Sequence, residues 1–133
     1  MISKKIIKVG AIALIGTMCT GIKVFADTGE FNFSIPVGEL EYSDSVKKSD
    51  SEQNWYCTPT FYALGEGDYV KLTVCSQDKD TTYTSLKAND LKRYIAAYSS
   101  SNSAKANKRY TLKGKCPANK TSGGVTMSGR WTP

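Results

Sequence analysis

The sequence contains no histidine among its 133 residues, and it has only four cysteines and four prolines. Histidine is the commonest general base and the usual partner of a nucleophilic serine or cysteine, so the Ser/His and Cys/His catalytic pairs are excluded. Metal sites that need an imidazole ligand are excluded as well. We therefore expect a protein that is not an enzyme and that uses no cofactor and no metal.

Acidic residues are missing from both ends of the chain. Residues 1–26 contain four lysines and no acid, and residues 91–133 contain nine basic residues and no acid. All twelve acidic residues lie in 27–90, together with five lysines. Much of the net charge of +6 therefore belongs to the first 26 residues. For this reason we do not expect a nucleic-acid partner.

The first 26 residues have the pattern of a secretory signal peptide. Lysines precede an apolar run from Val9 to Met18, and Ala26 offers a small residue for cleavage before Asp27. A membrane-spanning helix needs about 20 apolar residues in a row, and Gly16 interrupts this run. A lipid anchor at Cys19 is a weaker alternative. We predict cleavage between Ala26 and Asp27, and a secreted, extracellular single domain over 27–133 that is in part associated with the cell wall.

Three cysteines remain in that domain, namely Cys57, Cys75 and Cys116. An exported chain meets oxidising chemistry, so we expect one disulfide and one odd thiol. The turn 65–67 lies midway between Cys57 and Cys75, and a hairpin around it would place these two opposite each other. The alternatives are a bridge from Cys116 to either of them, or three buried thiols. An odd thiol would also offer a disulfide-linked dimer.

Apolar and polar residues alternate in several short segments separated by turn residues. This pattern is typical of strands with one face on a core, and it occurs at 31–35, 55–63, 69–75, 110–116 and 125–132. It predicts an all-β fold, a small antiparallel β-sandwich or partly open barrel of five to seven short strands. The expected core residues are Phe31, Phe33, Val70, Leu72, Val74, Leu112, Val125 and Trp131.

Two segments are harder to interpret. Residues 86–98 fit helical spacing and strand alternation equally well, so periodicity leaves both open. Residues 42–54 are rich in Ser, Asp and Lys, and we expect a solvated loop there.

The separation of charge along the domain has two interpretations. The two halves can pair strand against strand and neutralise each other, or the basic residues can gather on one face and raise the local positive potential. Outside a cell such a face would meet an anionic cell-wall polymer or a membrane surface. The candidate binding surface then comprises Lys92, Arg93, Lys105, Lys108, Arg109, Lys113, Lys115, Lys120 and Arg130.

Two further segments resemble a known family. Residues 94–112, with Tyr-Ile-Ala-Ala-Tyr-Ser-Ser-Ser at their start, and the ending Val125-Thr126-Met127-Ser128-Gly129-Arg130-Trp131 are similar to small secreted Gram-positive proteins of unknown function. The resemblance implies a signal peptide followed by about a hundred residues and assigns no catalytic residue. We therefore expect an envelope-associated binding or interaction domain. The alternative is a bacteriocin-like or toxin-like polypeptide that acts on competitor cells, since some genes of such families look associated with bacteriocin-type export systems.

Overall fold

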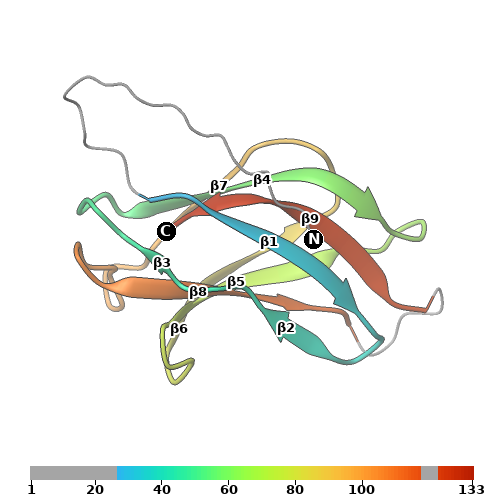
Figure 1. Cartoon of the computed structure of the whole chain (residues 1–133), viewed down its shortest axis with the longest axis horizontal. Coiled ribbons are helices and arrows are strands. Elements are labelled where there is room, and N and C mark those ends of the chain that lie inside the picture. The colour runs from blue at the N-terminus through green and yellow to red at the C-terminus, as the bar shows by residue number, and fades with distance from the viewer. Residues whose placement is uncertain (1–26, 118–122) are drawn as a thin grey trace.

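The computed structural model describes residues 27–117 and 123–133, which fold into two antiparallel β-sheets packed face to face (Figure 1). In sheet A the strand order is β1-β9-β4-β7, and in sheet B it is β2-β8-β5-β6, with β3 also pairing with β8. The two sheets do not close into a barrel. The predicted all-β sandwich is confirmed.

The described part of the chain contains nine strands, because short strands at the sheet edges add to the expected five to seven. The strands of sheet A are β1 (Gly29–Ile35), β4 (Asn54–Ala63), β7 (Tyr94–Ala97) and β9 (Val125–Thr132). Those of sheet B are β2 (Leu40–Tyr42), β3 (Val46–Lys47), β5 (Val70–Ser76), β6 (Thr82–Ala88) and β8 (Arg109–Lys115).

The core lies between the two sheets and is built from the inward positions of the alternating segments. In β1 the pattern Phe31, Phe33 and Ile35 is buried while Asn32 and Ser34 are exposed. This alternation follows from the period of two in a strand. All eight predicted core residues belong to the buried cluster, which also includes Trp55.

The predicted hairpin between Cys57 and Cys75 is wrong. The strands around them exist, but β4 belongs to sheet A and β5 to sheet B, so residues 64–69 connect the sheets instead of turning within one. Two strands that each carry an apolar face bury more surface when those faces meet across the core than when they lie side by side. Cys57 thus joins the core cluster, whereas Cys75 lies outside that cluster.

The expected disulfide is accordingly corrected as well. Cys57, Cys75 and Cys116 are all buried, free thiols in the described structure. This outcome matches the alternative of three separate buried thiols. The disulfide-linked dimer through an odd thiol stays a prediction, and all three thiols are buried in the described structure.

The two ambiguous segments also have definite structures. Residues 86–98 form the end of β6, a turn and β7, so strand alternation was the better guide there. The expectation of a solvated loop at 42–54 is wrong in part. This segment includes β3, and Lys48 within it has no exposed surface.

Candidate functional site

Strand β8 directs its charged side chains to one side. Tyr110, Leu112 and Gly114 are buried toward the core, so the alternate positions Arg109, Lys113 and Lys115 lie on the outer face of sheet B. Thr111 also points outward, although it is buried. The basic half of the sequence thus supplies one row of cations along a central strand.

The neighbouring strands add more cations instead of neutralising this row. Lys71 of β5 lies directly opposite Lys115 of β8 on one side and opposite Lys87 of β6 on the other. At the far end of β8, Lys47 of β3 lies opposite Arg109. We call these outward cations of sheet B the basic face; its members are Lys47, Lys71, Lys87, Arg109, Lys113 and Lys115.

The basic face has almost no acidic counterpart. Glu41 is the one acidic residue in the strands of sheet B, and its carboxylate accepts a hydrogen bond from the Ser34 N–H of β1, 3.1 Å away. Within residues 27–117 and 123–133, the one ion pair joins Lys48 and Asp50, which are not part of this face. Charge neutralisation strand by strand, the other interpretation of the sequence, does not occur in this sheet.

Like charges directly opposite each other on a sheet destabilise it. The face contains three such pairs, Lys71 with Lys87, Lys71 with Lys115, and Lys47 with Arg109. Protein stability therefore does not account for this arrangement. It concentrates positive potential over four neighbouring strands, β6, β5, β8 and β3, a width of about 15 Å at the usual strand spacing.

A further lysine reaches over this face from the turn between β5 and β6. The Lys79 ammonium lies 5.1 Å from the centre of the Tyr42 ring, a cation–π distance. Tyr42 itself pairs with Lys113. Cys75, which points outward but is 1% exposed, lies within the field of both lysines: burial raises the pKa of its thiol, and the charges of Lys113 and Lys79 partly oppose that rise.

At its Arg109 end, the basic face adjoins a pocket of about 440 Å³. The Arg109 guanidinium is held by hydrogen bonds to the hydroxyl and the carbonyl oxygen of Ser45, each 2.9 Å long. Asp78 is the acidic residue of the lining, and hydrogen bonds from the Ser76 hydroxyl and the Asp80 N–H lower its pKa. The lining also contains Arg109 and two loop lysines, so its cations outnumber this one carboxylate and the pocket extends the positive potential. The lining residues are Ser76, Gln77, Asp78, Tyr83, Ser103, Lys105, Lys108, Arg109 and Tyr110.

The outer face of sheet A has a different character. Its strands carry one acid and one base, Glu30 and Arg130, which lie directly opposite each other in β1 and β9. The remaining outward residues are uncharged and include Asn32, whose side-chain oxygen accepts a hydrogen bond from the Ser128 hydroxyl at 2.7 Å. The strands of the two sheets therefore present one balanced face and one strongly basic face.

The structure divides eight of the nine residues of the predicted binding surface among several places. Arg109, Lys113 and Lys115 lie on the basic face, Lys105 and Lys108 line the adjoining pocket, and the other described members lie on the side of sheet A. These others are Lys92 and Arg93 before β7 and Arg130 in β9. Lys120 lies outside the described residues. The eight described residues thus do not form one face.

Sequence reasoning missed three members of the basic face, namely Lys47, Lys71 and Lys87. All three come from the acidic half of the sequence, where acidic residues outnumber lysines, so the charge count gave no reason to expect a basic surface there. Alternation of Lys71 with Val70 and Leu72 did indicate an outward position. Its alignment with Lys115 and Lys87 depends on strand pairing, which periodicity does not reveal.

Lys48 forms a second unusual arrangement, inside the protein. Its ammonium has no exposed surface and lies 3.0 Å from an Asp50 carboxylate oxygen and 3.1 Å from the main-chain oxygen of Pro133, and it donates to both. It is also 5.5 Å from the centre of the Tyr98 ring. These contacts fasten the segment after β3 to the residue that follows β9. We interpret them as structural.

The buried thiol of Cys57 should not react with iodoacetamide in the native protein at pH 8. Burial raises its pKa to about 12, and the thiolate is the reactive form. Because the unfolded thiol ionises near pH 9, stability should fall as pH rises from about 9 toward 12, and less so in a Cys57→Ala variant. Mass spectrometry of native and urea-treated samples checks the first point. Equal alkylation of Cys57 in both would contradict it.

Comparisons with known proteins leave the family open: no protein-family model matches the chain, and no curated protein is significantly similar to it. The resemblance to small secreted Gram-positive proteins stays a prediction. Among the described residues, no helix is long and apolar enough to cross a membrane, and no group of three or more Cys, Asp or Glu side chains could hold a metal ion.

Proposed function

We propose that this is a secreted protein that binds anionic polymers of the cell envelope through the basic face of sheet B. The observation that carries the proposal is the set of three like-charged cross-strand pairs on sheet B. The one acidic residue in the strands of this sheet, Glu41, does not neutralise them, because its carboxylate is bound to the Ser34 N–H of β1. An arrangement that weakens the sheet is useful where a negative partner supplies the missing charge.

The shape of the basic face favours a polymer over a small ligand. Its cations are spread over four strands of a sheet, not gathered in one cavity. Adjacent strands are about 5 Å apart and alternate residues along a strand about 7 Å apart, so the ammonium groups form a grid. A chain with a negative charge at every repeat can contact several of them at once. The pocket beside Arg109 continues this path at one end.

The experiment is retention of the purified protein on beads that carry a glycerol-phosphate polymer, with beads that carry an uncharged glucose polymer as the control. We expect retention on the phosphate polymer in 0.1 M NaCl and elution by 1 M NaCl, since the screening length falls from about 10 Å to about 3 Å. Equal retention on both polymers, or retention that 1 M NaCl does not disturb, would overturn the proposal.

A further inference from the structure

Strand β1 forms one edge of sheet A, and several of its backbone hydrogen-bonding groups have no partner among residues 27–117 and 123–133. In an antiparallel pair, residues alternate between those that bond the partner strand and those that point away from it. The Ser34 N–H donates to the Glu41 carboxylate, away from β9, which identifies Ser34 as a residue of the second kind. Glu30 and Asn32 have the same parity in the register of β1 with β9. Their N–H and C=O groups therefore point to the free edge.

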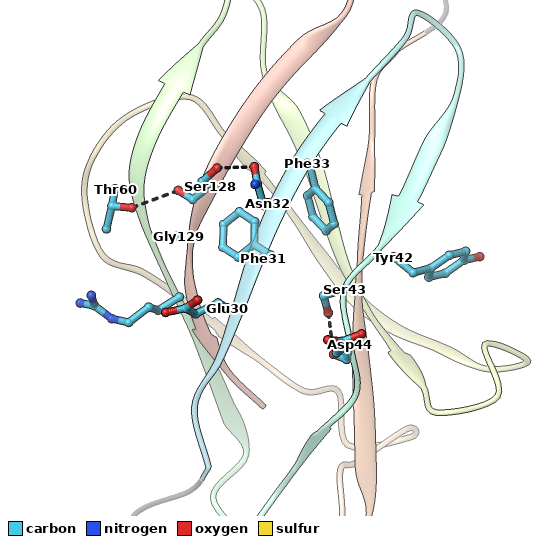
Figure 2. A pocket seen from close by; sticks show the side chains of 11 residues that line it. Glu30, Phe31, Asn32, Phe33, Tyr42, Ser43, Asp44, Thr60, Ser128 and Gly129 are labelled. Atoms are coloured by element: carbon cyan, nitrogen blue, oxygen red, sulfur yellow. Dashed lines mark hydrogen bonds between the residues drawn. The ribbon is translucent and has the colours of Figure 1, made fainter. Parts of the chain in front are cut away.

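The Glu41 carboxylate covers this edge at Ser34, and among residues 27–117 and 123–133 no strand pairs with it. A shallow groove of about 490 Å³ runs over β1, and its lining comes from both sides of the strand (Figure 2). Glu30, Asn32 and Ser128 line it from the outer face of sheet A, whereas Tyr42 at the end of β2 and Asp44 in the following segment line it from the other side. A groove lined from both sides leaves the strand edge between them accessible.

Strand β1 also lacks most of the features that protect sheet edges in other proteins: it is not short, it has no bulge, lysine or proline, and its one charged residue is Glu30. It is seven residues long and pairs with β9 without a register shift. By contrast, the other edge strands have such features: β6 has a register shift and Lys87, and β7 and β2 have four and three residues. An unprotected regular edge is suited to pair with another strand.

We propose that two copies of this protein form a dimer by antiparallel pairing of their β1 strands. The Ser34 N–H already donates to the Glu41 carboxylate, so a register in which this N–H would bond the second copy is disfavoured. The remaining register is centred on Phe31 and places Glu30 of each copy opposite Asn32 of the other. It provides four backbone hydrogen bonds, two from each strand.

The side chains in this register are complementary. The side-chain oxygen of Asn32 is already engaged by the Ser128 hydroxyl at 2.7 Å, and this leaves the amide NH₂ as donor. The group that faces it across the dimer is the Glu30 carboxylate, which is an acceptor. Symmetry forms this pair twice and sets no like charges opposite each other. This complementarity is the reason for choosing a second copy over an unrelated extended peptide.

The dimer has a consequence that rests on the proposed function. Antiparallel strands of identical chains are related by a two-fold axis perpendicular to the sheet, so both copies direct sheet B to the same side. The two basic faces would then contact one polymer layer together, and binding would gain from multivalency. The contact area is small, so we expect a weak dimer that forms at high concentration or on a polymer surface.

Cysteine trapping tests the register without any polymer. A Glu30→Cys variant mixed with an Asn32→Cys variant should form a disulfide-linked heterodimer under mild oxidation, since hydrogen-bonded cross-strand residues lie about 5.5 Å apart at Cα. Each variant alone should form at least tenfold less disulfide-linked dimer. The mixture of Glu30→Cys with Ser34→Cys should also form at least tenfold less. The native thiols are buried, and oxidised wild-type protein shows how much disulfide-linked dimer they form without the introduced cysteines.

Sedimentation equilibrium of the unmodified protein provides the second readout. Wild type should show a concentration-dependent dimer, and Asn32→Pro should abolish it. Proline removes the N–H that points to the free edge, and it leaves the hydrogen bonds between β1 and β9 intact. The inference is overturned if wild type stays monomeric at millimolar concentration, or if the trapped heterodimer does not exceed the Ser34→Cys control. Either failure leaves retention on the phosphate polymer unaffected and so is distinguishable from failure of the proposed function.

Discussion

Replacing Lys71, Lys87 and Lys115 by glutamine should weaken binding to the glycerol-phosphate polymer about 100-fold. These residues form a continuous row across β6, β5 and β8. A charge pair about 4 Å apart in water contributes about 1 kcal/mol, so three lost contacts amount to about 3 kcal/mol, or two orders of magnitude in Kd. Equilibrium binding to the soluble polymer at 0.1 M NaCl measures the change.

A matched control separates the basic face from net charge. The substitutions Lys92→Gln, Arg93→Gln and Arg130→Gln remove the same three charges from the side of sheet A, and we expect less than a fivefold change in Kd. Equal losses in both triple variants would show that overall charge governs binding and that the basic face is not the site.

Thermal unfolding of the first variant distinguishes a binding role from a structural one. Removal of like-charged cross-strand neighbours should leave the stability unchanged or raise it by about 0.5 kcal/mol. If the three lysines instead support the fold, the triple variant unfolds at a lower temperature, and its weaker binding then has a structural explanation.

The substitution Asp50→Ala should lower the free energy of unfolding by about 3 kcal/mol. It leaves the fully buried Lys48 ammonium with the main-chain oxygen of Pro133 and the Tyr98 ring as its described partners. Breaking a buried ion pair by removing one partner typically costs about 3–5 kcal/mol, and we take the lower value because Asp50 is one-third exposed. For a domain of this size, Tm should fall by about 10–20 °C.

The Lys48→Met variant is the informative control for that loss. Methionine retains much of the lysine stem without the charge, and replacing a buried charge by an apolar side chain is often neutral or stabilising. We expect Lys48→Met to remain within about 1 kcal/mol of wild type. Urea denaturation of both variants decides the matter: similar losses would show that packing around Lys48, not its charge, determines the effect.

Particular residues show why some features followed from the sequence and others did not. Phe31 and Phe33, or Leu72 and Val74, alternate with polar neighbours, and all four are buried as predicted. Cys57 and Cys75 illustrate the opposite case. Symmetry around a glycine turn suggested a hairpin, yet the connection crosses between sheets. A turn signal marks where a chain reverses and does not specify the sheet that the next strand joins.

The buried Lys48 shows a second kind of miss. A lysine in a segment rich in serine and aspartate is normally solvated, and composition gave no reason to expect otherwise. Its burial depends on Asp50 close by in sequence and on Pro133 far away. A contact over that separation exists only once β9 is in place.

Sequence patterns are enough to predict that the domain is all-β, which residues of its longer strands face the core, and that its basic residues gather in the second half. These features depend on the local period of two and on composition, which are readable without any long-range contact. The tertiary structure alone decided that Lys71, Lys87 and Lys115 form one row, that the thiols stay apart, and that β1 has a free edge. Each of these depends on which strands pair and in what register, and the core, acting over the whole chain, selects that pairing.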